Sequence, residues 1–453
     1  MNERRILSVN SFIFNLSSLI LLTSSLILFS CKDSTSGDNT VTVSGTVYLE
    51  DQTDHSGVKV SLYKPVELDT TLVRLNRQYP NIGVPITQAT EFDHRNETPL
   101  YFTTSTPSGD WSIAKITPGT YNIVAEKDSF SWKYLLEYQT GSNITIDTLK
   151  SLRYLSGILN DDLNLKNCGV IIENLTIPVN TNLNISGQSY VLVAENAAVE
   201  VYGGFHVQGT VQSPVVISSV NIEGWRMIEC LANSDLNLRY CKIMNAKNAV
   251  FNKTGTIIFE NNIVMSNQIG FQNFNLSDSL NIQSNLFRKN MIGLYNSEIA
   301  KISIQKNLFL NNKIAMRCES TANFNLVNNI SYEDSCSLEI NNGLFFSNST
   351  GSLSYCQFEK NTTAITIGGK ATRITGMECN FLNSTSWFIG ATRGNAEIDS
   401  SYFRSNYWEY NNNGLFQEYQ IKERIMDSED DITGKNGQFI DVSNFKENRI
   451  KIN

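Results

Sequence analysis

An internal repeat of about 22 residues runs through the second half of the chain and restricts its possible folds more than any other feature. Eight repeats align on a starting position that is usually Asn or Cys: Cys241, Asn262, Asn285, Asn307, Asn329, Cys356, Cys379 and Ser401. Two places on, seven of the eight residues are apolar and five of them are Phe. Asn is commonest five places on, and an apolar residue stands nine places on. The period is too short for propeller blades and differs from that of paired-helix repeats.

Stacked coils of parallel β-structure account for these columns, because strands about 4.8 Å apart place equivalent residues above one another. An Asn at each turn can then hydrogen-bond to the Asn of the next coil and satisfy backbone groups that the turn leaves open. We therefore predict a structural ladder, formed by Asn262, Asn285, Asn307 and Asn329. The pattern resembles the right-handed parallel β-helix of pectin-lyase-like and NosD-like proteins over residues 165–445. A helix-like stretch at 416–426 is expected to cap its open end.

A small antiparallel β-sandwich is predicted before the repeat, over residues 42–148, because short runs of alternating apolar and polar residues are separated by Gly and Pro. The segment resembles the carboxypeptidase regulatory-like fold, which is transthyretin-like, at Gly45, Gly57, Gly109, Trp111, Pro118, Gly119 and Tyr121. That resemblance implies a non-catalytic module for folding, spacing or carbohydrate contact. Residues 65–99 interrupt it and are either a ligand loop or a surface excursion. The predicted fold class is thus all-β, a sandwich followed by a single-stranded β-helix.

The N-terminus predicts export. A positive start and an apolar run indicate a signal peptide at residues 1–30, and the ending Leu28-Phe29-Ser30-Cys31 resembles the lipobox of bacterial lipoproteins. The resemblance implies that Cys31 is lipidated and that residues 31–41 form a tether. The expected location is the bacterial cell envelope, at the outer membrane or cell surface, with the lipid anchor as the contact to the membrane.

The amino-acid composition argues against several kinds of binding partner. The net charge of -8 provides no basic face for nucleic acid, and the three His residues leave little scope for a His-based site. No CxxC pair is present, so neither a metal nor a cofactor is predicted. Cys356 and Cys379 should lie on adjacent coils, either as buried thiols or as a disulfide. The protein is expected to be monomeric.

No catalytic residue is predicted. Enzymes on this type of fold need paired outward carboxylates, whereas the outward column ten places after each starting position from Phe251 onward holds the single acid Glu339 beside Arg317. That pair is interpreted as a surface ion pair, and Asp334 as a substitute within the second Asn column. The same column predicts a binding strip, because aromatic and amide side chains suit sugar recognition. The strip consists of Phe251, Gln272, Tyr295 and Arg317.

Three functions remain open. The first is a non-catalytic surface module whose β-helix binds polysaccharide or another envelope component. The second is a polysaccharide lyase or hydrolase acting on the β-helix face. The third is a NosD-like accessory protein in metal-centre assembly, which depends on the resemblance of the fold alone.

Overall fold

A computed structural model covers residues 1–453. It describes residues 39–141, 144–166, 168–221, 224–274, 280–297, 301–319, 323–341, 349–368, 372–391, 400–411, 417–430 and 438–453. The predicted signal peptide, Cys31 and most of the predicted tether lie outside these residues. In the part of the chain that is described, no helix has the length and apolar character needed to cross a membrane.

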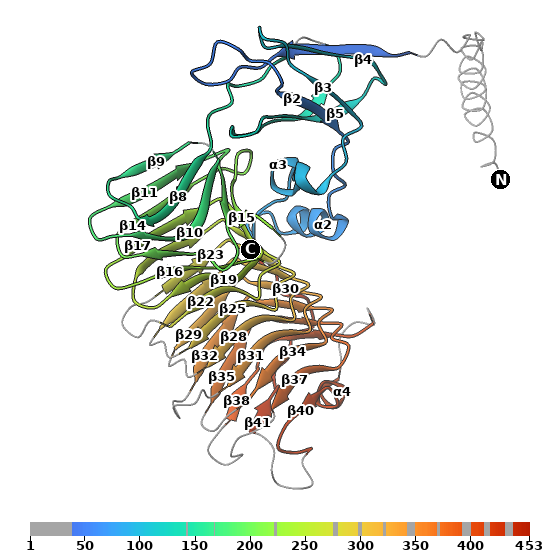
Figure 1. Ribbon diagram of the computed structural model, residues 1–453. Helices are drawn as coiled ribbons and strands as arrows, with labels where there is room; N and C mark the ends of the chain where they lie inside the picture. Colours follow the sequence, from blue (N-terminus) through green and yellow to red (C-terminus); the bar gives the residue numbers. More distant parts are fainter. Residues whose placement is uncertain are drawn as a thin grey trace, which may run out of the picture.

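The N-terminal part is a β-sandwich of two sheets (Figure 1). One sheet has the order β4 (Asp110–Ile116), β1 (Val41–Thr46) and β7 (Ile144–Thr145). The other has the order β3 (Tyr101–Thr104), β2 (Lys59–Tyr63), β5 (Thr120–Glu126) and β6 (Lys133–Gln139). All pairs are antiparallel except β1 with β7, which is parallel. Trp111, Ile113, Val60 and Ile123 are among the buried residues that hold the two sheets together.

A right-handed parallel β-solenoid follows, and each coil adds one strand to each of three sheets. Sheet 1 consists of β9 (Leu163–Leu165), β11 (Asn182–Ser186), β14 (Gly204–Gln208), β17 (Asp235–Arg239), β20 (Thr256–Glu260), β23 (Leu280–Gln283), β26 (Ile302–Gln305), β29 (Phe324–Val327), β32 (Thr350–Ser354), β35 (Arg373–Met377), β38 (Ser400–Tyr402) and β41 (Phe439–Asp441). The predicted all-β fold class, with antiparallel sheets before a parallel solenoid, is confirmed.

The other two sheets begin together at β8 (Arg153–Ile158) and the long strand β10 (Gly169–Ile177). Sheet 2 continues with β12 (Tyr190–Val193), β15 (Val215–Ser219), β18 (Cys241–Met244), β21 (Ile263–Met265), β24 (Leu286–Arg288), β27 (Leu308–Leu310), β30 (Ile330–Tyr332), β33 (Gln357–Glu359), β36 (Asn380–Leu382) and β39 (Tyr407–Glu409). Sheet 3 continues with β13 (Ala198–Val201), β16 (Trp225–Cys230), β19 (Ala246–Asn252), β22 (Ile269–Asn273), β25 (Ile292–Ser297), β28 (Ile314–Glu319), β31 (Cys336–Asn341), β34 (Thr363–Ile367), β37 (Trp387–Ala391) and β40 (Ile425–Met426).

Aromatic rings stacked along the inner side of sheet 2 fill the solenoid. Phe287 and Phe309 are parallel within 7°, with ring centroids 5.0 Å apart. Phe381 stacks in the same way on Trp408, with centroids 4.2 Å apart. Each ring is fully buried, and burial of such a side chain stabilises the fold by about 1.5–3 kcal/mol. The stack therefore links coil to coil through the interior.

The last repeat is offset from the alignment that the sequence suggested. Cys379 pairs with Asn406 and not with Ser401, because the Cys379 backbone N–H donates to Asn406 Oδ1 at 2.8 Å and Asn380 is in register with Tyr407. Trp408 consequently takes the inner aromatic position, while Ser401 lies in β38 of sheet 1. The extra residues of this coil precede β38, where spacing alone gave no sign of them.

The C-terminal end of the solenoid is covered as expected, although with a shorter helix. Helix α4 spans Glu418–Lys422, and Ile425–Met426 form the strand β40 instead of continuing it. Ile421 of α4 is fully buried and belongs to the same core as the solenoid strands. The helix therefore shields core that the last coil leaves open.

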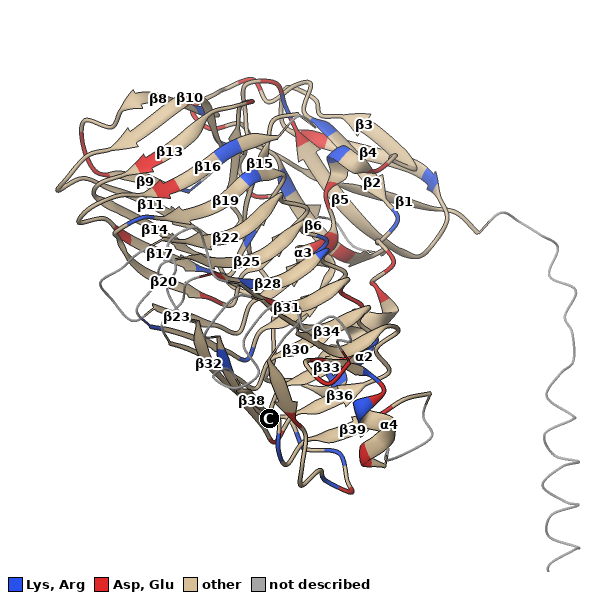
Figure 2. Ribbon diagram, turned by 90° about the horizontal axis from the view of Figure 1, so that it is seen from below, with Lys and Arg blue, Asp and Glu red and all other residues tan. Residues whose placement is uncertain are grey.

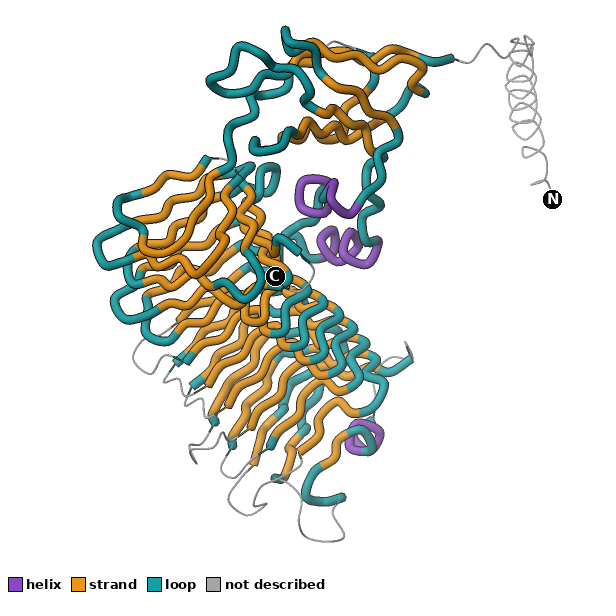
Figure 3. The backbone as a smooth tube through the Cα atoms, in the orientation of Figure 1, coloured by secondary structure: helices purple, strands orange, loops and turns teal. Residues whose placement is uncertain are grey.

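Residues 65–99, the insertion into the sandwich, pack on the outer side of sheet 2. They contain α2 (Thr70–Gln78), α3 (Gln88–Glu91) and a short 3₁₀ helix (His94–Asn96). Figure 3 shows both α-helices between the sandwich and the solenoid. Leu72 and Leu75 of α2 share a buried cluster with Leu286 and Leu308 of sheet 2. The insertion thus joins the two parts of the molecule.

Candidate functional site

The structure brings the four residues of the predicted strip to one register on the outer side of sheet 3. Phe251 pairs with Gln272, Gln272 with Tyr295, and Tyr295 with Arg317, each on the adjacent strand. All four side chains are partly exposed. At about 4.8 Å per coil, Phe251 and Tyr295 lie roughly 10 Å apart along the solenoid axis. The strip is therefore one contiguous row; its role in binding stays a prediction.

Neighbouring side chains hold the uncharged part of the strip in place. The ammonium group of Lys253 lies 5.4 Å from the centroid of the Phe251 ring. The amide of Asn248 donates to the side-chain oxygen of Gln272. The hydroxyl of Tyr295 donates to Glu319 Oε2 at 2.7 Å. Burial, together with this carboxylate, raises the pKa of Tyr295 to about 12, so the phenol stays neutral over the physiological range.

Arg317, the last residue of the strip, takes part in two ionic contacts. Arg317 contacts Glu339 Oε2 at 2.9 Å and Glu319 Oε1 at 4.0 Å, so one guanidinium bridges two carboxylates. The sequence-based expectation of a surface ion pair between Arg317 and Glu339 matches this geometry. Both partners are about one-quarter exposed, and the pair is worth about 0–1 kcal/mol.

Paired carboxylates are nevertheless present further upstream, where the sequence-based search had not extended. Glu200 and Glu229 are in direct register on β13 and β16, and Glu229 is in turn in register with Phe251. Glu200 pairs with Arg226 at 3.5 Å and Glu229 with Lys253 at 2.6 Å. Figure 2 shows acidic and basic segments on the neighbouring strands β13 and β16. Glu229 and Glu200 precede Phe251 by one and two coils in the same outward column, so extending the search to these two coils would have revealed the pair.

The predicted ladder residues are stacked at the turn between sheets 1 and 2. Each backbone N–H of Asn262, Asn285 and Asn307 donates to the Oδ1 of the next Asn, at 2.9 to 3.0 Å. Their side-chain amides donate to carbonyl groups of the preceding coil, as Asn307 does to Ile282 at 2.9 Å. These asparagines are fully buried. Their polar groups are satisfied within the wall and are not presented to a ligand.

The outer side of sheet 2 is covered from β21 to β30, which the sequence had not indicated. Ile263, Leu286, Leu308 and Ile330 point outward yet are 0–2% exposed, because the insertion covers them. The C-terminal residues 450–452 pack on the same face, and the C-terminus lies beside α2 in Figure 1. One feature of the sequence could have indicated this cover: these short strands are apolar on both faces.

The cysteines are buried thiols in this structure. The residues that the structure describes include seven cysteines, and all seven are free, six of them buried and Cys336 partly so. Burial raises the pKa of Cys168 to about 11 and that of Cys318 to about 12, so little reactive thiolate forms.

We expect the native protein without Cys31 to react slowly with a thiol reagent, and the denatured, unreduced protein to show seven thiols. Thiol titration with and without denaturant measures both values. A count lower by two after denaturation would instead indicate a disulfide, for which Cys356 and Cys379 on adjacent coils are the nearest candidates.

Two further findings concern cofactors and relatives. Among the residues that the structure describes, no group of three or more His, Cys, Asp or Glu side chains is placed to hold a metal ion. No family model matches the chain, and no curated protein is significantly similar to it in sequence.

Proposed function

We propose that the protein is a non-catalytic glycan-binding module of the bacterial cell envelope, attached through a lipid on Cys31. In this proposal the solenoid holds a polysaccharide along the strip of Phe251, Gln272, Tyr295 and Arg317. The sandwich and the insertion act as a rigid base that presents the solenoid. The resemblance of the sandwich to the carboxypeptidase regulatory-like fold agrees with such a role.

The observation that carries the proposal is the contrast between two outer faces of the solenoid. The outer face of sheet 2 is covered by segments of the same chain, whereas the strip on sheet 3 stays partly exposed. The strip offers two aromatic rings with an amide between them. Aromatic rings stack on the apolar faces of sugars, and amides bind their hydroxyl groups. A row that follows the solenoid axis suits an extended polymer.

Changing Tyr295 to alanine should weaken retention by the bound polysaccharide roughly 2- to 10-fold, because an aromatic contact is worth about 0.5–1.5 kcal/mol. Native gels cast with neutral or acidic polysaccharides measure retention by the retarded migration of the chain without its signal peptide. Tyr402 is a matched control, because it is an exposed tyrosine on sheet 1 of the same solenoid. We expect Tyr402→Ala to migrate like the unchanged protein. Unretarded migration in every gel would contradict the proposal.

A polysaccharide lyase or hydrolase is the second candidate. Glu319 lies on the same strand as Arg317, and Glu339 lies on the next coil. The Arg317 guanidinium contacts both carboxylates, and Tyr295 donates to Glu319. Two carboxylates beside a basic group are the elements that glycoside cleavage or proton abstraction uses. Clearing of the polymer in the gel, abolished by Glu339→Gln, would favour this function over binding alone.

A further inference from the structure

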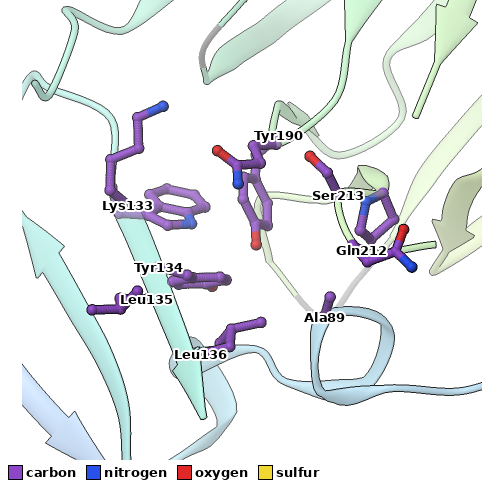
Figure 4. A pocket seen from close by; sticks show the side chains of 11 residues that line it. Ala89, Lys133, Tyr134, Leu135, Leu136, Tyr190, Gln212 and Ser213 are labelled. Atoms are coloured by element: carbon purple, nitrogen blue, oxygen red, sulfur yellow. The ribbon is translucent and has the colours of Figure 1, made fainter. Parts of the chain in front are cut away.

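A cavity of about 210 Å³ lies where the sandwich meets the first coils of the solenoid. Strand β6 forms one wall, α3 contributes Ala89, and residues 188–190 and 212–214 of the solenoid form the opposite wall. Figure 4 shows Tyr134 and Leu136 of β6 pointing toward Tyr190 across the cavity. A cavity of about 150 Å³ holds a benzene ring, so this one has room for a single six-membered ring with substituents.

The inner part of the cavity presents aromatic rings. The hydroxyl of Tyr134 is engaged there, whereas Trp132 Nε1 is buried with no hydrogen-bond partner among the described residues. The hydroxyl of Tyr134 lies 2.7 Å from His94 Nδ1, and the Tyr134 ring packs edge-on against the Tyr190 ring with centroids 5.6 Å apart. His94 Nε2 lies 3.0 Å from Glu126 Oε2, which continues the buried network into the sandwich. The Trp132 and Tyr190 rings pack together with centroids 4.8 Å apart. These rings are therefore held in place by packing, and they offer a ligand their faces and edges.

The mouth of the cavity carries uncommitted polar groups. Gln188 and Gln212 are exposed, and neither side-chain amide bonds to another residue that the structure describes. The Ser213 hydroxyl lies beside them. Two amides and a hydroxyl around an aromatic floor match a ring that has apolar C–H faces and several hydroxyl groups at its edge. The lining residues include Lys133 and no carboxylate, so the ligand class is neutral or anionic.

We propose that this cavity binds one pyranose unit, as a monosaccharide or as the end of a glycan chain. The site needs both parts of the molecule, because β6 and α3 form one side and the solenoid the other. It is separate from the strip on sheet 3 and does not depend on polymer binding there. Occupation of the cavity would bridge the sandwich and the solenoid and hold them together.

Isothermal titration calorimetry and saturation-transfer NMR with methyl glycosides of glucose, N-acetylglucosamine and glucuronic acid test this site on the whole protein. At least one glycoside should bind. Ala89→Trp should weaken its binding about tenfold or more by filling the cavity. Gln212→Ala should weaken it about 2- to 10-fold, because one hydrogen bond is worth about 0.5–1.5 kcal/mol. Cyclohexanol, which has a similar ring with one hydroxyl, should bind more weakly.

Two controls separate this site from non-specific binding and from misfolding. Gln52→Ala removes an exposed glutamine of the sandwich that does not line the cavity, and it should leave glycoside binding unchanged. Circular dichroism and the unfolding temperature of Gln212→Ala, a surface change, should match the unchanged protein. The proposal is overturned if no glycoside binds at millimolar concentration, if both cavity variants bind normally, or if cyclohexanol binds as well as the glycosides.

Discussion

Replacing Asp334 with asparagine should raise the free energy of unfolding by about 4 kcal/mol at pH 8 and leave it nearly unchanged at pH 4. Asp334 is fully buried in the second Asn column, and burial raises its pKa from 3.8 to about 7. Between pH 3.8 and about pH 7 the carboxyl group of the unfolded chain is ionised, while that of the folded chain keeps its proton. The free energy of unfolding of the unchanged protein therefore falls as the pH rises through this range. Asparagine cannot ionise, so the variant does not lose stability in this way as the pH rises. Urea unfolding at pH 4 and pH 8 measures this difference.

The asparagine should also fit the site. Asn312 donates its backbone N–H to Asp334 Oδ1 at 2.6 Å, and an asparagine oxygen accepts this bond equally well. In the neighbouring coil the Asn312 amide donates to the Phe287 carbonyl at 3.0 Å. Phe309 stands in register with Phe287, so its carbonyl is placed to accept from the new amide.

Glu333 provides the matched control, because it is the adjacent acid in the same turn and its side chain is 38% exposed. Glu333→Gln should shift the urea midpoint little and by the same amount at both pH values. Asp334 accepts from the Asn312 backbone N–H, the Asn312 amide and the Ser331 hydroxyl. If Asp334→Asn were less stable than the unchanged protein at pH 8, these donors would require the ionised carboxylate, and the assignment of a burial penalty would be wrong.

The sequence predicted the solenoid because every coil repeats the same local physics. The Asn columns can satisfy turn backbones only by stacking, and the Phe column can be buried only inside such a stack. The strip followed from the same register, since alternate residues of a strand face opposite sides. The register was lost only in the last coil, because Ser401 stands at the expected spacing of 22 residues after Cys379 whereas Asn406, the true equivalent, follows after 27.

Contacts between segments that are distant in the chain could not be predicted from the sequence. Outward Leu286 and Leu308 signal a covered face, but nothing local identifies α2, more than 200 residues away, as the cover. The cavity is harder still to foresee. Its wall joins Tyr134 of the sandwich to Tyr190 of the solenoid, and each lies in an unremarkable strand until the two parts are docked.

That docking should depend strongly on one buried ion pair. Changing Glu91 to glutamine should destabilise the packing of the insertion on sheet 2 by about 3–5 kcal/mol, the cost of leaving a buried charge without its partner. Glu91 Oε2 accepts from Arg288 Nη2, and the Arg288 side chain is only 5% exposed. Lys242 is buried nearby, and its pKa is lowered first by burial, with Arg288 adding to the effect. Glutamine would leave both cations without the compensating carboxylate.

Trypsin cleavage within α2, at Arg74 and Arg77, reports on release of the insertion, and the unfolding transition measures the loss of stability. We expect faster cleavage in Glu91→Gln than in Glu67→Gln, a control that changes an acid of the same insertion whose side chain is 91% exposed. Adding Arg288→Met to Glu91→Gln should restore much of the lost stability, because apolar replacements of a buried pair are often neutral or stabilising. If Glu91→Gln resisted trypsin as well as Glu67→Gln, the apolar contacts of Leu72 and Leu75 would be sufficient to hold the insertion. The cavity beside α3 would then keep its shape without the ion pair.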